Sequence, residues 1–195
     1  KGLIDVDGKI SDADIKTLAG EIKTTIYNGR VANPIVNKAF DLKLKSPLSF
    51  KGDILTTLQP NKLVSKVDFF TSMANVFVKK AVVDLSDSSI NSDYQVKIAD
   101  LNKLYDVTNT KMQGAIQLDG TASITKDIIV TGTSNVFAGK LDFKLKNDDF
   151  SANVNNIELK SLTHMLFYPQ VFDSLANATV TYNLVKATGI VDATL

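Results

Sequence analysis

Residues 128–165 read IIVTGTSNVFAGKLDFKLKNDDFSANVNNIELKSLTHM, and this stretch decides the fold. Apolar and polar residues alternate in three successive runs, with a small-residue break at Ala138-Gly139 and a polar turn at Asn147-Asp148-Asp149. Side chains of a strand point alternately to opposite faces, so the runs predict antiparallel strands with one apolar and one polar face. From Leu159 onward the apolar residues recur at three- and four-residue spacing, which predicts a short amphipathic helix.

The rest of the chain repeats this pattern. Strand-like alternation covers residues 4–10, 54–58, 63–69, 76–78, 83–85, 92–98, 115–118, 179–184 and 190–195. Ser11 followed by Ile15, Leu18, Ala19 and Ile22 predicts a capped helix. Asn28-Gly29 predicts a turn between two strands, and the alternation from Phe40 to Leu44 predicts another strand that Pro47 ends.

An internal repeat follows from the order of these elements. The pattern acid-aliphatic-x-x-Leu follows a strand at residues 14–18, 100–104 and 158–162, and a strand returns after it. Such a repeat is typical of a sheet that grows by adding similar units. We therefore expect residues 1–195 to form a single elongated, repeat-built β domain. The chain begins at Lys1, and we expect it to be a fragment of a longer protein.

Composition excludes several function classes. With a net charge of +1, the chain lacks the excess of positive charge that is typical of a nucleic-acid binder, and we expect no nucleic-acid partner. The chain has no cysteine, which excludes thiolate catalysis, thiolate metal sites and disulfides. No segment has the length and hydrophobicity of a membrane span.

Few residues favour catalysis or metal binding. His164 is the only histidine, it has no nucleophile motif around it, and we interpret it as a structural or partly exposed helix residue. Asp5, Asp7 and Asp14 match the later half of a calcium loop, but the first ligand position falls on Leu3. We expect no enzyme activity, no metal and no cofactor.

The apolar strand faces carry the functional hypothesis, because little helical material is available to cover them. Two sheets could face each other in a sandwich. Alternatively, one long antiparallel sheet folds over lengthwise into an apolar groove, which needs a guest. Acyl chains suit such a groove, since each buried methylene is worth about 0.8 kcal/mol and needs no hydrogen bond. The predicted groove lining is Tyr94, Val96, Ile116, Leu118, Ile128, Val130, Leu141, Phe143, Leu145 and Val154. The residues predicted to face water are Lys97, Lys140, Asp142 and Lys144.

Two longer segments carry a family resemblance. Ser134 to Phe143 with Asn147 to Phe150, and Leu162 to Asp173 with the return strand Ala178 to Leu184, resemble the C-terminal region of AsmA-like proteins. The earlier stretches 67–71, 90–94 and 100–105 are similar to family members from Gram-negative bacteria of the campylobacter and helicobacter kind. The likeness covers most of the chain from about Asn28 onward.

The resemblance to these AsmA/TamB-type proteins implies a location, a fold and a partner. It implies a periplasmic protein anchored to the inner membrane by a helix outside this fragment. It also implies a folded-over (β-taco-like) sheet with a few short helices, related to bridge-like lipid-transfer proteins. Its groove would carry phospholipid acyl chains in support of outer-membrane biogenesis. Two alternatives stay open: an envelope scaffold or assembly module with a closed β core and no ligand, and a calcium-dependent docking module.

Overall fold

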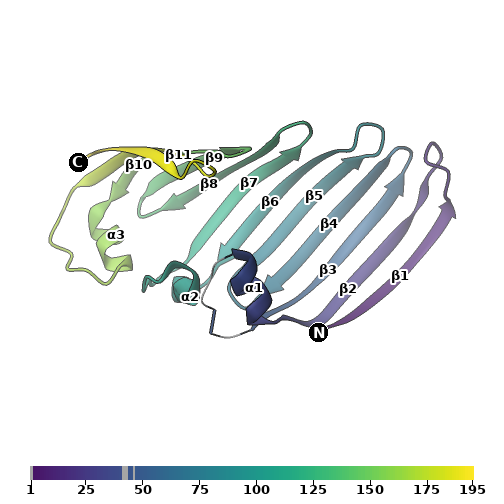
Figure 1. The fold of residues 1–195 in the computed structure, drawn as a ribbon, viewed down its shortest axis with the longest axis horizontal. Coiled ribbons are helices and arrows are strands. Elements are labelled where there is room, and N and C mark those ends of the chain that lie inside the picture. Colours follow the sequence, from purple (N-terminus) through teal and green to yellow (C-terminus); the bar gives the residue numbers. More distant parts are fainter. Residues whose placement is uncertain (1, 41–43, 46) are drawn as a thin grey trace.

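The computed structural model describes residues 2–40, 44–45 and 47–195. This part of the chain folds into one sheet of twelve antiparallel strands, and every strand pairs with its neighbours in sequence (Figure 1). The prediction of a mainly β, antiparallel fold is confirmed. Strands β1 and β12 form the two edges, so the sheet is not closed. The strands are β1 (Leu3–Asp12), β2 (Ala19–Val31), β3 (Leu48–Gln59), β4 (Lys62–Thr71), β5 (Asn75–Asp84), β6 (Ser89–Ile98), β7 (Ile116–Ile124), β8 (Ile128–Val136), β9 (Gly139–Lys146), β10 (Asp149–Glu158), β11 (Leu175–Asn183) and β12 (Thr188–Thr194).

The helices of the described residues all lie along one rim of this sheet. They are α1 (Asn33–Phe40), the 3-10 helix η1 (Leu101–Leu104), α2 (Tyr105–Thr108) and α3 (Leu159–Met165). Each belongs to a connection from an even-numbered to an odd-numbered strand, and an antiparallel meander brings all such connections to the same end. We call this end the helical rim, and the opposite end, with its short turns, the hairpin rim (Figure 1).

Two sequence predictions near the N-terminus are wrong. No helix forms from Ser11 to Ile22, because β1 ends at Asp12, a turn follows and β2 begins at Ala19. Ile22 pairs with Gly8 on one side and Thr56 on the other, so hydrogen bonding to two strands overrides the helical spacing. Asn28-Gly29 forms no hairpin turn either. It lies within β2 as a bulge, with Asn28 at a φ of 48°.

The predicted strand from Phe40 to Leu44 is also not formed at its two described ends; residues 41–43 lie outside the described residues. Phe40 is the last residue of α1. Leu44 is only 4% exposed, and its backbone N–H donates to Asn37 Oδ1 at 2.9 Å. The side chain of Asn33 donates to the Leu44 carbonyl oxygen at 3.0 Å. Helix α1 therefore holds Leu44 in place of a strand ladder.

The three segments of the predicted repeat lie in two kinds of connection. Residues 100–104 and 158–162 enter η1 and α3, both at the helical rim, and the short helix expected after Leu159 is confirmed. The Asp100 carboxylate accepts the Asn102 backbone N–H at 2.9 Å and so caps η1. The copy at 14–18 is a turn at the hairpin rim. The third helical connection contains α1, so helices recur after every four strands.

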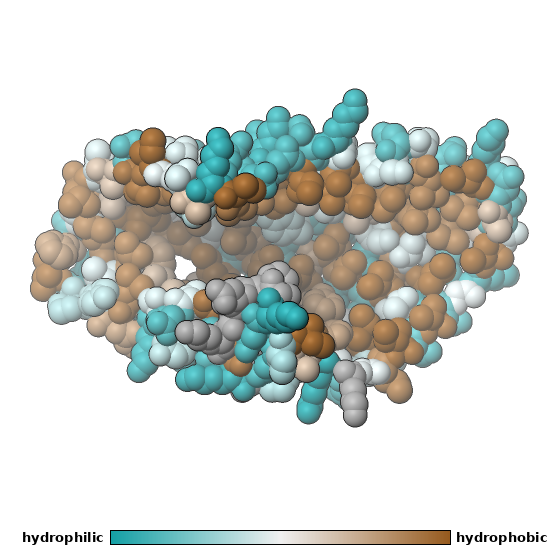
Figure 2. Space-filling view, in the orientation of Figure 1, coloured by the Kyte–Doolittle hydropathy of each residue, from teal (hydrophilic) through white to brown (hydrophobic). Residues whose placement is uncertain are grey.

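The sheet covers little of its own surface. The accessible area of the chain is 12689 Å², whereas a compact protein of 21.2 kDa exposes roughly 9,000 Å². Among the described residues no side chain is less than 2% exposed, and the buried apolar ones are Leu44, Leu58, Leu101, Ala152 and Ile157. The hydrophobic side chains gather instead over the hollowed side of the sheet (Figure 2). No second layer of described secondary structure packs over that side.

Candidate functional site

One row of side chains crosses the whole sheet on its apolar face. Residues directly opposite each other in a ladder share a face, so the strand registers can be followed from edge to edge. This apolar row is Val6, Thr24, Ile54, Val67, Val78, Tyr94, Gly120, Gly132, Phe143, Ala152, Val180 and Val191. Only Thr24 and Tyr94 carry a polar group. The edge members Val6 and Val191 are 62% and 66% exposed, while the inner members are half-buried or buried.

All ten residues predicted to line a groove lie on this same face. Some are direct partners across the ladder: Val96 with Leu118, Val130 with Leu145, and Leu141 with Val154. Ile116 and Ile128 lie at the ends of their strands, and Ile128 is 49% exposed. The four residues predicted to face water, Lys97, Lys140, Asp142 and Lys144, lie on the opposite face. The register brings the two sets to opposite sides of one sheet.

Sequence reasoning missed much of the same face. The apolar side extends beyond β6–β10 to strands on both sides, where it includes Ile54, Val67, Val78 and Val180. The same two-residue alternation was present there. The bulges in β2 and β5 shift that alternation by one residue and hid its continuity.

Glycines and aromatic rings alternate across the apolar face. Each of five glycines lies under the ring of a partner on a neighbouring strand, so close that an added Cβ would clash with the ring. The pairs are Gly29 with Phe50, Gly52 with Phe69, Gly120 with Tyr94, Gly132 with Phe143 and Gly189 with Tyr182. Because glycine has no side chain, the ring lies over the neighbouring backbone and shields its hydrogen bonds.

Tyr94 shows this arrangement best. Its ring crosses over Gly120, and its hydroxyl donates to the Thr131 carbonyl oxygen of β8 at 2.9 Å. One side chain thus spans three strands. Burial raises the pKa of the Tyr94 hydroxyl, because the charged form loses solvation.

A polar row runs parallel to the apolar row on the opposite face. It consists of Asp5, Thr25, Asp53, Asp68, Phe77, Gln95, Asp119, Thr133, Asp142, Asn153, Thr179 and Asp192. Two of its acids form ion pairs on the same face: Lys140 Nζ lies 2.9 Å from Asp142 Oδ1, and Lys66 Nζ lies 3.3 Å from Asp68 Oδ2. Hydrogen bonds from Gln117 and Gln95 lower the pKa of Asp119. This face is a solvated surface on which several charges are paired.

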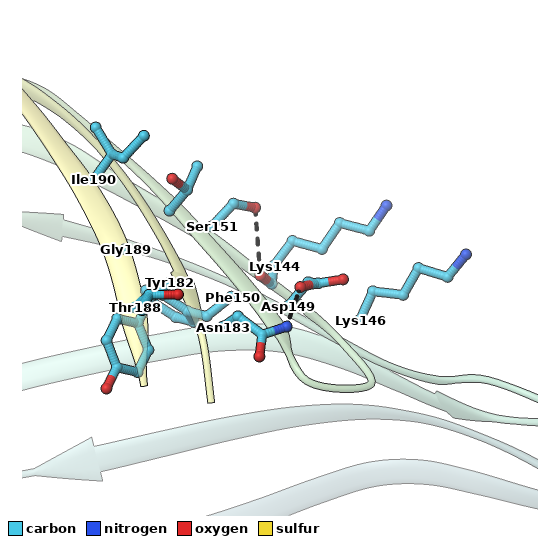
Figure 3. A pocket seen from close by; sticks show the side chains of 11 residues that line it. Lys144, Lys146, Asp149, Phe150, Ser151, Tyr182, Asn183, Thr188, Gly189 and Ile190 are labelled. Carbon is cyan, nitrogen blue, oxygen red and sulfur yellow. Dashed lines mark hydrogen bonds between the residues drawn. The ribbon is translucent and has the colours of Figure 1, made fainter. Parts of the chain in front are cut away.

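Two open cavities lie at the C-terminal half of the sheet. The first, of about 700 Å³, is lined largely by polar side chains of β9–β12 (Figure 3). Asn183 there donates to Asp149 Oδ1 at 2.6 Å, and Lys146 pairs with Asp127 at 3.2 Å, so these groups are satisfied without a ligand. The second, of about 1040 Å³, lies at the helical rim, between Asp100, Asn102 and Lys111 on one side and Phe167 and Tyr168 on the other.

The residues considered for catalysis or calcium do not assemble into a site. His164 is an exposed residue of α3, and its ring Nε2 lies 3.4 Å from Gln113 Nε2. Asp5 and Asp7 belong to the extended strand β1, whereas Asp14 lies in the following turn, so no calcium loop forms. Across the described residues, no group of three or more His, Cys, Asp or Glu could hold a metal ion.

Among the helices of the described residues, none is both long enough and apolar enough to cross a bilayer. No family model, curated protein or solved structure matches this chain.

Proposed function

We propose that this chain is a non-enzymatic lipid-binding segment that carries phospholipid acyl chains along the apolar face of its sheet. The carrying observation is the apolar row, which runs unbroken from β1 to β12 and has no described secondary structure over it. In this proposal the sheet folds over lengthwise into a groove, lined by the ten predicted residues and by their equivalents on the remaining strands. An apolar surface of this extent calls for an occupant.

Acyl chains are the occupant that the chemistry of this face favours. Its residues offer mainly hydrocarbon and aromatic rings. Several of its hydroxyls are already bonded within the sheet: Tyr94 donates to the Thr131 carbonyl oxygen, and Thr56 and Ser65 are bonded to each other. A fatty tail gains about 0.8 kcal/mol for each methylene removed from water, wherever along the row it lies. The tail can therefore slide without passing a specific anchor, while its head group stays in solvent at the open rim.

The wider setting is also part of the proposal. The resemblance to AsmA-like proteins supports a periplasmic location, an inner-membrane anchor outside this fragment and a role in outer-membrane biogenesis. The two alternatives have less support. An envelope scaffold with a closed β core requires a closed sheet, whereas β1 and β12 are separate edges. A calcium-dependent docking module requires a cluster of acids that the described residues do not form.

Mass spectrometry of lipid bound to the purified protein tests the proposal. We expect phospholipid to copurify with the wild type. Leu145→Glu, which places a charge on the apolar face, should reduce the bound lipid several-fold, because a buried charge without a partner is strongly disfavoured. Ser151→Glu is the matched control, since Ser151 lies on the adjacent strand but on the polar face, opposite Lys144. Wild-type protein free of lipid, or an equal loss in both variants, would contradict the proposal.

A further inference from the structure

The connection between α3 and β11 is an exposed apolar loop. We use "apolar loop" for residues 166–174, Leu-Phe-Tyr-Pro-Gln-Val-Phe-Asp-Ser, which adopt neither helix nor strand. Phe167, Tyr168, Val171 and Phe172 are 59%, 65%, 71% and 59% exposed. Large apolar side chains at this density are unusual on a surface exposed to water. The loop extends from α3 at the helical rim (Figure 1).

The backbone of the loop is held in a costly conformation that contributes to this exposure. Phe167 has a φ of 59°, in the left-handed region that costs a residue with a side chain about 1–2 kcal/mol. Hydrogen bonds fix the conformation: the Phe167 N–H donates to the His164 carbonyl at 3.1 Å, and the Tyr168 N–H donates to the Thr163 carbonyl at 2.9 Å. The left-handed residue that follows the C-cap Leu166 ends α3 and leaves the ring of Phe167 exposed to solvent.

The surroundings of the loop carry polar groups suited to a lipid head group. Phe167 and Tyr168 border the cavity of about 1040 Å³, whose other wall presents Asp100, Asn102 and Lys111. Both signs of charge are therefore available beside the apolar side chains. A phospholipid presents the same combination, because its phosphate and amine lie next to its tails.

The two rims differ in charge and in exposed apolar residues. Among the described residues, the connections of the helical rim carry five Lys and three Asp, whereas those of the hairpin rim carry three Lys and four Asp. Ile35 of α1 and Val107 of α2 bring the exposed large apolar residues of the helical-rim connections to six, at 66% and 42% for these two. The described connections of the hairpin rim carry three, Ile15, Leu184 and Val185, and none of these is aromatic. A modest positive balance together with apolar groups favours an anionic bilayer surface.

We propose that the apolar loop docks the helical rim onto a phospholipid bilayer, with Phe167, Val171 and Phe172 entering the acyl layer and Tyr168 at the head groups. The interior of a bilayer, which is apolar and deformable, accommodates the apolar loop better than a groove on another protein would. The loop has neither a helix face nor a strand edge to present to a protein partner. This proposal rests on the function proposed above. Docking of the helical rim places the open side of the sheet at the bilayer, where lipid can enter.

A tryptophan reporter tests the insertion directly, because the chain contains no tryptophan. Phe172→Trp is mixed with vesicles of equal parts phosphatidylethanolamine and phosphatidylglycerol. We expect its emission to shift to shorter wavelength and to be quenched by bromine on the acyl chains. Val185→Trp, at a residue 75% exposed on the hairpin rim, should show neither effect. An unshifted Phe172→Trp, or equal shifts in the two proteins, would overturn the proposal.

Sedimentation with the same vesicles gives the second readout. The double variant Val171→Asp/Phe172→Asp should bind the vesicles roughly ten-fold more weakly or worse, because it replaces two inserting apolar side chains with charges. A ten-fold loss corresponds to about 1.4 kcal/mol of binding free energy. Both residues are exposed, so the thermal unfolding midpoint should stay unchanged. Val185→Asp is the control and should bind as the wild type does. Wild-type protein that stays in the supernatant, or a double variant that sediments normally, would refute the docking. Failure of the conduit would look different: protein without copurified lipid that still sediments with vesicles.

Discussion

At the scale of single residues, the five glycine–aromatic pairs determine the surface shape of the apolar face. A ring that lies over a glycine adds apolar surface without standing upright above the sheet. The ring also excludes water from the backbone hydrogen bonds of a strand that has no side chain of its own at that position. The face is therefore smooth and apolar at the same time, and each pair depends on the absence of a Cβ.

Gly120 is the pair member for which this dependence is most severe. A Cβ built at Gly120 would lie 2.1 Å from the Thr131 carbonyl oxygen and 2.6 Å from Cζ of Tyr94. The oxygen belongs to the backbone of β8 and cannot move without disturbing the ladder. We expect Gly120→Ala to lower the free energy of unfolding by about 1–3 kcal/mol, as overpacking does. Urea denaturation would measure this change.

Ser123→Ala is the control for Gly120→Ala, because Ser123 lies on the same strand but faces the other side. It should change the free energy of unfolding by no more than about 0.5 kcal/mol. If Gly120→Ala proved as mild as its control, the close approach of Tyr94 and Thr131 would not constrain this position.

At the scale of elements, the turn between β8 and β9 has a sequence that fits its backbone poorly. Phe137 and Ala138 have φ values of 51° and 59°, in the left-handed region that glycine adopts at no cost. Ala138→Gly should raise the free energy of unfolding by up to about 1 kcal/mol, because relief of strain outweighs the greater freedom of glycine in the unfolded chain. Ala138→Val should lower the same quantity. Thermal unfolding of the two variants would show opposite shifts, and shifts of the same sign would contradict this account.

The elements that were predictable from sequence are those whose pattern agrees with their pairing. Strands with an uninterrupted two-residue alternation, such as β6 and β8–β10, were predicted at the right place and with the right face. Helix α1 was missed although Asn33-Pro34 carries a signal, since proline is favoured in the first turn of a helix. The false helix over Ser11–Ile22 arose because a spacing of three and four residues can occur by chance across a turn and the start of a strand. Ile22 is part of a strand because it pairs with β1 on one side and β3 on the other, and the sequence pattern does not reveal this pairing.

The candidate site was predictable in part for the same reason. Alternation assigns a residue to a face, and the register places all ten predicted lining residues together. Alternation cannot say whether another layer covers that face, how a bulge shifts the pattern, or where a loop projects. The exposure of Phe167 and Phe172 therefore follows from the structure alone, although the run Leu166-Phe167-Tyr168 was visible in the sequence.

At the scale of the whole molecule, stability should depend on acid pH through carboxylates that make hydrogen bonds or ion pairs. Hydrogen bonds from Gln117 and Gln95 lower the pKa of Asp119, a bond from Lys140 lowers that of Asp142, and a bond from Asn147 lowers that of Asp127. A carboxylate whose pKa is lowered in the folded state stabilises the fold at pH values above the usual Asp pKa of 3.8. This stabilisation is lost as the pH falls through the lowered pKa.

We therefore expect the denaturation midpoint to be level above about pH 5 and to fall steadily below about pH 4. Asp119→Asn should flatten this fall, because it removes one of the titrating groups. Urea midpoints measured from pH 7 to the lowest pH that keeps the protein soluble would show the trend. A midpoint that rises on acidification would contradict the assigned bonds.

The two unpaired edges have a consequence for length. Each strand advances the sheet by about 4.8 Å, so twelve strands trace a curved path of roughly 50 Å from edge to edge. Each strand needs only its two neighbours, as in other stacked repeats. Inserting or removing one hairpin would then change the reach of the molecule by about 10 Å and leave the character of the remaining surface intact. Evolution could thus adjust the distance this protein spans in steps of one hairpin.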